Sequence, residues 1–323
     1  MKAIRIHQHG GPEVLRYEEA PVPEPGPGEV LIEIHVSGVN FVDTYVRSGL
    51  YKPPSIPFTP GAEAAGIISK LGAGVTDVRV GDRVAYATSL GSYAEFAAVP
   101  SWKLALLPES VDFRSGAAIM LQGLTAHYLT HSTFPLKAGQ TALVHAGAGG
   151  VGLLLIQVAR KLGATVIATA GTEQKAQLAR GAGAQETIVY SQQDFESEVK
   201  RITNGKGVDV VYDAVGAATW EKSLNSLKPR GYLVLYGNAS GPVPPVDPLV
   251  LMKASLFVTR PTLVHYAASR EEVQARTGDL FRWMASGELK LKTDHMFPLA
   301  DAARAQMDLE ARRTTGKVLL QVR

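Results

Sequence analysis

The first hundred residues carry short apolar runs in which hydrophobic and polar positions alternate. Residues 29–36 (EVLIEIHV) alternate as a half-buried strand should, and a proline-rich connector at 21–28 precedes them. Glycine-containing turns separate further strand-like pieces. The strands expected in this region are residues 1–7, 29–36, 65–70 and 83–86. The pattern therefore predicts an all-β, barrel-like domain.

From residue 115 the apolar positions take helical spacing, first in an expected helix over 115–131. Beyond it, β-prone runs alternate with amphipathic segments. Strands are expected at 141–146, 165–170, 186–189, 208–213 and 231–236, and helices at 173–180, 194–203 and 218–227. This alternation predicts an α/β fold with a doubly wound parallel sheet. A strand at 255–259 follows; helices at 271–286 and 300–310 and a strand at 317–322 are expected to rejoin the first domain.

A glycine-rich turn joins the strand at 141–146 to the next apolar helix. Gly147, Gly149 and Gly152 have the spacing G-x-G-x-x-G, which permits a tight turn, close approach of backbone N–H groups to a pyrophosphate, and close packing of helix on strand. The N–H groups of Gly150 and Val151 would lie at the positive end of that helix. Such turns also occur where nothing binds, but the flanking strands complete a βαβ unit. The sequence therefore predicts a dinucleotide site.

The amino-acid composition limits the kinds of site that the chain can form. The chain of 323 residues has no cysteine, which excludes disulfides, thiolate nucleophiles, iron–sulfur clusters and cysteine-ligated zinc. The net charge of +3 suits anionic ligands, without the basic stripe that would indicate nucleic acid. No apolar run approaches the roughly 20 residues of a membrane span, and no signal-peptide core opens the chain. A cytoplasmic protein without a membrane partner is expected.

The residues after the second strand of the βαβ unit distinguish NADP from NAD. An NAD site usually places an acidic residue at the end of that strand, about 20 residues past the glycines, where it binds the ribose diol. Here the strand ends with Ala170, Gly171 and Thr172, and Lys175 follows closely. A cation attracts the 2′-phosphate that an acid would repel, so NADPH is the expected cofactor. A solvated helix lysine is the competing interpretation of Lys175, and the nearby Glu173 weakens the prediction.

Several motifs together make the chain resemble a zeta-crystallin-like quinone oxidoreductase of the medium-chain dehydrogenase/reductase superfamily, over essentially its whole length. They are residues 38–45 (GVNFVDTY), 60–66 (PGAEAAG), 80–84 (VGDRV), 122–126 (QGLTA), the glycine turn and 236–238 (YGN). The resemblance implies a GroES-like β-barrel catalytic domain from residues 1–122 and 264–323, a Rossmann NADPH-binding domain over 123–263, and an active site in the cleft between them. It also implies a homodimer formed through an edge strand of the Rossmann sheet, for which 255–259 is the candidate.

Zinc-dependent alcohol dehydrogenases of the same superfamily differ at three positions. Asn40 stands where they place a cysteine ligand, Ala62 where they place a histidine, and Leu121 where they place the third ligand. The segment after Tyr86 is also too short to hold their structural zinc lobe. The resemblance and the missing cysteines together imply an enzyme that binds no metal.

The resemblance also assigns site residues by position. Tyr45 and Tyr51 are the candidate catalytic residues, because a tyrosine can stack on a quinone and donate its hydroxyl to a carbonyl oxygen. Packing is their competing role, and Asp43 is expected to be a structural acceptor. Tyr51 lies on a loop over 49–54 that is expected to wall the site. The candidate cofactor-binding residues are Asn40, Thr125, Gly147, Gly149, Gly150, Val151, Gly152, Gly171, Thr172, Lys175, Tyr190, Tyr236, Asn238 and Arg312, the last of which could instead be a solvated helix end.

These observations predict metal-free reduction of a quinone by NADPH, with the cofactor supplying the hydride and the protein placing the acceptor beside it. One alternative keeps NADPH but changes the acceptor to an α,β-unsaturated aldehyde or ketone. Another, drawn from the resemblance, is AU-rich RNA binding or a structural, crystallin-like role. RNA binding would be salt-sensitive and would compete with NADPH, and no RNA-binding motif supports it.

Overall fold

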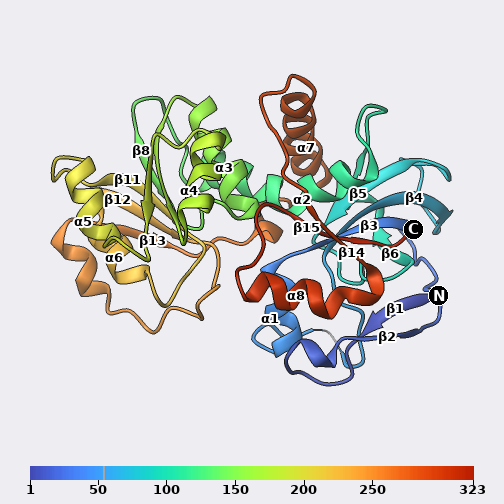
Figure 1. Cartoon of the computed structure of the whole chain (residues 1–323). Helices are drawn as coiled ribbons and strands as arrows, with labels where there is room; N and C mark the ends of the chain where they lie inside the picture. Colours follow the sequence, from blue (N-terminus) through green and yellow to red (C-terminus); the bar gives the residue numbers. More distant parts are fainter. Residues whose placement is uncertain (54) are drawn as a thin grey trace. The chain divides into compact units, whose positions relative to one another are not determined.

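The computed structural model describes residues 1–53 and 55–323, which divide into two compact units (Figure 1). Unit 1 comprises Met1–Leu124, Ala267–Gly287 and Leu291–Arg323, and unit 2 comprises Thr125–Tyr266 and Glu288–Lys290. Each unit is built around a sheet of its own. No helix among the described residues is long and apolar enough to cross a membrane.

Unit 1 is organised around a seven-stranded sheet. Its strands are β3 (Glu29–Val39), β4 (Glu63–Leu71), β5 (Arg83–Ala87), β6 (Phe96–Pro100), β7 (Leu104–Leu106), β14 (His295–Pro298) and β15 (Val318–Gln321). They follow the order β14-β15-β3-β4-β5-β7, and β6 pairs with β3. β1 (Lys2–Arg5) and β2 (Arg16–Glu19) form a separate antiparallel pair. Val30, Ile32 and Ile34 of β3 are fully buried in the core, as the alternation predicts.

The helices of unit 1 include one, α1 (Phe41–Ser48), that corrects the prediction that the first hundred residues are all-β. They are α1, α2 (Phe113–Tyr128), α7 (Arg270–Ala285) and α8 (Ala302–Glu310), with the last residues of α2 counted in unit 2. The pattern of apolar positions does not reveal α1, because this helix buries Asp43, Thr44 and Arg47 instead of an apolar stripe. Its signals lie at its ends: the Asp43 carboxylate accepts the Asn40 backbone N–H at 2.8 Å, and Gly49 ends the helix with a φ of 84°.

Unit 2 contains the doubly wound sheet that the sequence predicts. Its strands are β8 (Thr141–Val144), β9 (Thr165–Ala170), β10 (Glu186–Val189), β11 (Val208–Asp213), β12 (Leu227–Leu235) and β13 (Phe257–Thr259), all parallel, in the order β10-β9-β8-β11-β12-β13. The chain order reverses between β8 and β11, the place where ligands bind in sheets of this kind. The prediction of an α/β fold is confirmed.

Helices cover both faces of this sheet. α3 (Gly150–Lys161) packs against α4 (Glu173–Ala182), and α5 (Phe195–Ile202) packs against α6 (Trp220–Asn225). Figure 1 shows the first pair on one side of the strands and the second pair on the other. The helix expected to run to residue 131 ends earlier, because α2 is followed by a π-helical turn, Leu129–Thr133.

Candidate active site

The turn after β8 begins with a residue in the left-handed region. Ala146 has a φ of 53°, and its carbonyl accepts the Gly149 N–H at 2.9 Å. The Gly147 N–H donates to the Thr169 carbonyl of β9 at 2.9 Å, which ties the turn to the neighbouring strand. The strained position of the turn is therefore Ala146, a residue that the glycine motif does not single out.

Close packing explains why glycine is needed at two of the motif positions. A Cβ at Gly152 would lie 2.3 Å from the Ala146 carbonyl oxygen, and a Cβ at Gly147 would lie 2.9 Å from the Ala168 Cβ. Neither distance accommodates a carbon atom, so only glycine lets the first turn of α3 approach β8 and β9 this closely.

The start of α3 offers backbone donors to an anion. Gly149 is the N-cap residue, and Gly149, Gly150 and Val151 are partly exposed. The first N–H groups of a helix have no partner within the helix, and the helix dipole makes that end positive. Phosphate oxygens are the ligands that such a helix start binds best, so the geometry fits the pyrophosphate of a dinucleotide.

A buried polar network beneath this turn went unnoticed in the sequence. The His145 ring bonds to the hydroxyl of Thr169 at 2.9 Å and to that of Ser223 at 2.9 Å, and the Ser223 hydroxyl donates to Asp213 at 2.9 Å. Burial lowers the pKa of His145, and the Asp213 charge opposes that shift. These side chains resemble a Ser-His-Asp arrangement but are at most 1% exposed, so they join β8, β9, β11 and α6 without reaching a substrate.

The end of β9 gathers the residues expected to select NADPH. Thr172 caps α4, and its side chain accepts the Lys175 backbone N–H at 3.3 Å. A Cβ at Gly171 would lie 2.8 Å from the Tyr190 hydroxyl, so these two residues lie side by side. Glu173 forms an ion pair with Arg180 at 2.6 Å. This pairing partly neutralises the Glu173 charge, which would otherwise oppose binding of a 2′-phosphate. The arrangement suits a 2′-phosphate better than a ribose diol.

The other predicted cofactor residues lie in both units. Thr125 is buried in the part of α2 that belongs to unit 2. Tyr236 and Asn238 follow β12, where the Tyr236 N–H donates to the Asp213 carbonyl at 2.9 Å. Arg312 is exposed after α8 in unit 1, with a φ of 57°.

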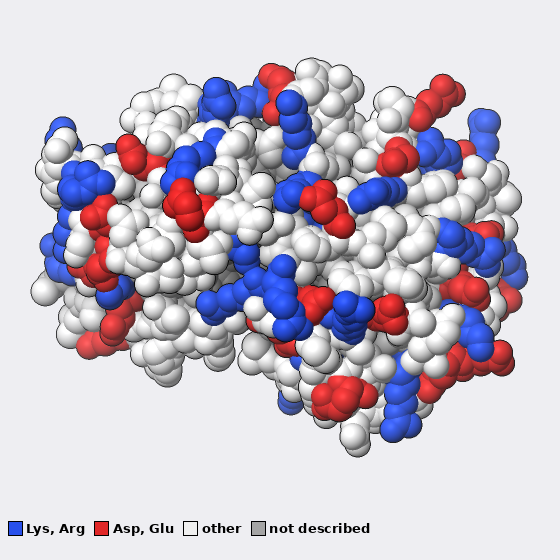
Figure 2. All heavy atoms as spheres, in the orientation of Figure 1, with Lys and Arg blue, Asp and Glu red and all other residues white. Residues whose placement is uncertain are grey.

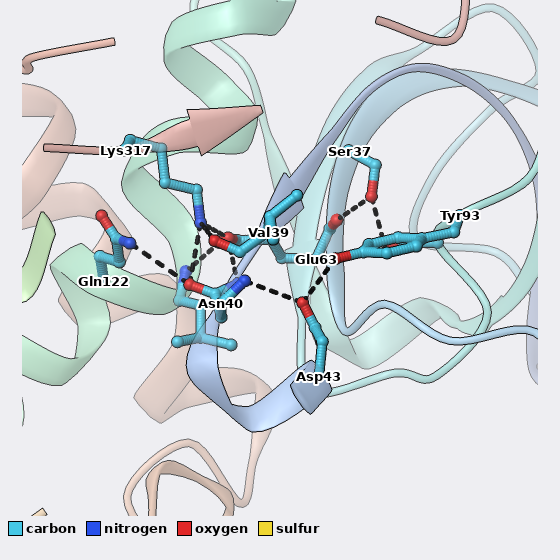
Figure 3. A network of polar contacts seen from close by, with 10 residues as sticks. Ser37, Val39, Asn40, Asp43, Glu63, Tyr93, Gln122 and Lys317 are labelled. Carbon is cyan, nitrogen blue, oxygen red and sulfur yellow. Dashed lines mark hydrogen bonds and ion pairs between the residues drawn. The ribbon is translucent and has the colours of Figure 1, made fainter. Parts of the chain in front are cut away.

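Unit 1 holds a buried polar cluster around Asn40 (Figure 3). The Asn40 side chain donates to Glu63 at 2.7 Å and accepts from the Lys317 ammonium at 2.9 Å and from Gln122 at 3.3 Å. Lys317 also forms an ion pair with Glu63, and the second carboxylate oxygen of Glu63 accepts the Leu121 N–H at 2.7 Å. Burial lowers the pKa of Lys317, while the Asp43 charge opposes this shift.

Asp43 extends the cluster towards the core. Its carboxylate accepts the Asn40 backbone N–H at 2.8 Å and the Tyr93 hydroxyl at 2.9 Å. Burial raises the pKa of Asp43 to about 6, although these hydrogen bonds and the Lys317 charge favour the ionised form. Burial and the Asp43 charge also raise the pKa of Tyr93 well above its usual value. Asp43 thus has the structural acceptor role that the sequence suggests.

The cluster does not have the chemistry of a zinc site. Asn40, Ala62 and Leu121 supply no thiolate or imidazole, which are the ligands that zinc prefers. No group of three or more His, Cys, Asp or Glu within the described part of the chain could hold a metal ion. The Lys317 ammonium lies among these positions and would repel a second cation.

The candidate catalytic tyrosines contact each other. The rings of Tyr45 and Tyr51 meet edge to face with centroids 5.4 Å apart, and the Tyr51 N–H donates to the Tyr45 carbonyl at 3.0 Å. Tyr45 is partly exposed and Tyr51 is 38% exposed, so both have ring surface that a flat ligand can contact. The last residue of the expected wall, Pro54, lies outside the described residues.

Sequence reasoning assigned no role to Glu63, Gln122 or Lys317. The available signal was a charged residue beside apolar ones: Glu63 lies in AEAAG, two residues before the strand expected at 65–70, and Lys317 begins the strand expected at 317–322. A buried acid and a buried base usually pair. Their positions are 254 residues apart in the chain, so the pairing itself could not be derived locally.

Charged side chains on the surface are mixed in sign. Figure 2 shows acidic and basic residues interspersed on the visible face of each unit. In unit 2, for example, Lys161 pairs with Glu288, and Lys200 pairs with Glu196. This mixture fits a small-molecule enzyme better than a nucleic-acid surface, which concentrates positive charge.

Two family models match the chain: an alcohol dehydrogenase GroES-like domain over residues 26–109 and a zinc-binding dehydrogenase over residues 150–284. A quinone oxidoreductase of Pseudomonas aeruginosa is 48% identical over 321 residues, covering 99% of both chains. A solved structure of Escherichia coli quinone oxidoreductase complexed with NADPH matches with a TM-score of 0.98 and 46% identity, covering 100% of both chains. A 2-haloacrylate reductase of a Burkholderia species is 43% identical over 98% of both chains.

The similarity is high over the whole chain, and both units have the folds that the motifs imply. The match to a zinc-binding dehydrogenase model extends to the fold but not to the ligands, because a metal-ligand set is missing at Asn40, Ala62 and Leu121. The chain therefore belongs to the quinone oxidoreductases of the medium-chain dehydrogenase/reductase superfamily.

Proposed function

We propose that this protein is an NADPH:quinone oxidoreductase that uses no metal. The observation that supports this cofactor is the end of β9, where Gly171, Thr172, Lys175 and Tyr190 lie together. No acidic residue directly follows Ala170, and the nearby Glu173 is paired with Arg180. The acceptor is supported by the quinone oxidoreductases that match the chain over its full length.

In this proposal the glycine turn and the start of α3 hold the pyrophosphate of NADPH. Lys175 and Tyr190 bind the 2′-phosphate through the lysine charge and the tyrosine hydroxyl. The other residues proposed to line the cofactor are Thr125, Tyr236, Asn238 and Arg312, and also Asn40, which would lie beside the nicotinamide without donating a hydrogen bond to it. Bound NADPH supplies a hydride and leaves as NADP⁺.

The protein's own part in the chemistry is to place and polarise the acceptor. A quinone that takes up a hydride becomes a hydroquinone monoanion, and one proton from water completes the hydroquinone. Tyr45 and Tyr51 offer a ring edge, a ring face and hydroxyl donors to a flat acceptor of this kind. The reaction needs no Lewis acid, which agrees with a site that holds an ammonium group instead of metal ligands.

The direct test is the anaerobic initial rate of cofactor oxidation with a simple ortho-quinone, run with NADPH and with NADH. Fast turnover with the quinone and NADPH, and slow turnover with NADH, is the expected result. Absence of quinone reduction with either cofactor would contradict the proposed function. RNA added to the same assay at low and high salt tests the remaining alternative, which requires competition with NADPH at low salt.

A second candidate is NADPH-dependent reduction of an activated carbon–carbon double bond. The specific observation in its favour is the 2-haloacrylate reductase, which is 43% identical and whose solved structure matches with a TM-score of 0.86. The acceptor would then take the hydride at its β-carbon. Adding 2-hexenal and 2-chloroacrylate to the rate measurements separates the two functions.

We also propose that the protein works as a cytoplasmic homodimer, joined through β13. Among the strands that the structure describes, β13 is an edge of the sheet in unit 2 and pairs with β12 alone. Phe257 and Val258 on it are 48% and 39% exposed, and Leu249 and Met252 in the preceding 3₁₀ segment are 69% and 76% exposed. An apolar edge of this kind invites pairing with a second copy.

A further inference from the structure

The amide of Asn40 is held at both ends by charged groups. Its oxygen accepts two hydrogen bonds, from the Lys317 ammonium at 2.9 Å and from the Gln122 amide at 3.3 Å. Its nitrogen donates one hydrogen to Glu63 at 2.7 Å. An amide oxygen has two lone pairs and an amide nitrogen has two hydrogens, so the oxygen is saturated. Among the residues that the structure describes, one Asn40 hydrogen is left without an acceptor.

Lys317 and Glu63 leave the amide only one orientation. Turning it over would place the amide NH₂ against the ammonium and the amide oxygen against the carboxylate, and both contacts would be repulsive. The ammonium also polarises the amide, which strengthens the remaining N–H as a donor. Asn40 can therefore meet a ligand only as a donor.

Lys317 cannot contact a ligand itself. Its side chain is 3% exposed, and its ammonium faces three acceptors: Glu63, the Asn40 side-chain oxygen and the Val39 carbonyl at 3.4 Å. These acceptors match its three hydrogens in number. Any influence that Lys317 has on the reaction must pass through Asn40, which lies at the start of the helix that carries Tyr45 (Figure 3).

We propose that Lys317 is a positioning residue for the reduction, which with Glu63 locks the Asn40 amide so that its remaining N–H donates to the acceptor oxygen on which negative charge develops. The inference rests on the proposed function, because that function supplies the charged oxygen. Donors fixed in place before the reaction stabilise such a charge without reorganising during it.

The test compares three variants with the wild type by kcat, by the KM values for NADPH and quinone, and by thermal unfolding. Lys317→Met with Glu63→Gln removes both charges of the ion pair together, so that neither partner is left buried opposite a neutral side chain. Lys317→Arg keeps the cation. Leu320→Ala is the matched control, because it removes buried apolar packing from β15, the strand that directly follows Lys317, and leaves the polar contacts of Asn40 in place.

We expect the double variant to lose about tenfold or more in kcat, since loss of an entire oxyanion donor lowers kcat about 100- to 1000-fold. Its KM for NADPH should change little, and Lys317→Arg should recover most of the kcat. A kcat equal to wild type in the double variant would overturn the proposal, as would an equal fall in Leu320→Ala. A wild type that does not reduce quinones would instead contradict the proposed function, which separates the two failures.

Discussion

Asp43 ionises in surroundings that oppose its charge. Burial raises its pKa from 3.8 to about 6, against the Asn40 N–H, the Tyr93 hydroxyl and the Lys317 charge. The folded protein therefore binds the Asp43 proton more tightly than the unfolded chain does. The contribution of this group to the free energy of unfolding falls as pH rises from about 4 to about 6, and a shift of about two pKa units corresponds to about 3 kcal/mol.

Asp43→Asn removes this titration, and its amide oxygen can still accept from Asn40 and Tyr93. Between about pH 4.5 and about pH 7.5, we expect the free energy of unfolding of the wild type to fall by up to about 3 kcal/mol because of Asp43, and that of the variant to lack this fall. Urea unfolding at both pH values measures the difference. Asp194→Asn should leave the pH dependence in this range nearly unchanged, because a hydrogen bond from Lys222 lowers the pKa of Asp194 to about 2 and its titration lies at lower pH. An unchanged pH slope in Asp43→Asn would mean that this carboxyl does not titrate in the range.

Lys175 is the residue on which, in the proposed function, the choice between NADPH and NADH depends. Only NADPH carries the 2′-phosphate, so Lys175→Ala should raise the KM for NADPH severalfold and leave that for NADH nearly unchanged, since an ion pair of a partly exposed side chain contributes up to about 1 kcal/mol. Lys175→Arg should retain most of the preference. Lys206→Ala removes an exposed lysine elsewhere in unit 2 and is the matched control. Equal effects on both cofactors would remove Lys175 from the phosphate site.

At the scale of elements, the packing of α3 against the glycine turn depends on the close approach of Gly152 to the Ala146 carbonyl oxygen. A Cβ at Gly152 would lie 2.3 Å from a backbone oxygen that cannot rotate away. We expect Gly152→Ala to destabilise the fold by about 1–3 kcal/mol and to weaken NADPH binding, measured by urea unfolding and by fluorescence titration. Gly181→Ala in α4 is the control, because a Cβ there would have no described atom within 4 Å apart from its chain neighbours and the backbone of its own helix. That variant should be neutral or up to about 1 kcal/mol more stable.

Elements with apolar faces could be predicted from the sequence, and elements without them could not. β9, β10 and β11 have the predicted bounds because buried parallel strands form continuous apolar runs. α1 escaped prediction because its buried residues are polar, and their partners lie far away in the chain: Arg47 donates to Gln306 at 2.6 Å across 259 positions. A polar helix of this kind becomes recognisable only when the tertiary contacts are known.

At the scale of the whole molecule, the same contrast separates the two units. The proposed cofactor residues from Gly147 to Lys175 lie close together in sequence, on consecutive turns of one βαβ unit, so a local motif predicts them. The cluster in unit 1 draws Asn40, Glu63, Gln122 and Lys317 from four distant segments. The position of Asn40 in the family motif indicated this residue from the sequence. The charged groups that orient its amide could be identified only from the three-dimensional structure.

The proposed dimer predicts the mass of the protein in solution. If β13 pairs with a second copy, light scattering should give twice the 34.5 kDa mass of one chain. Val258→Lys places a charge on that edge, and a charge on an edge strand opposes strand pairing, so this variant should dissociate to monomers. Val80→Lys puts the same charge on a 60% exposed valine of unit 1 and should leave the mass unchanged. A wild-type monomer at micromolar concentration would contradict the assembly, and a dimer that survives Val258→Lys would place its interface elsewhere.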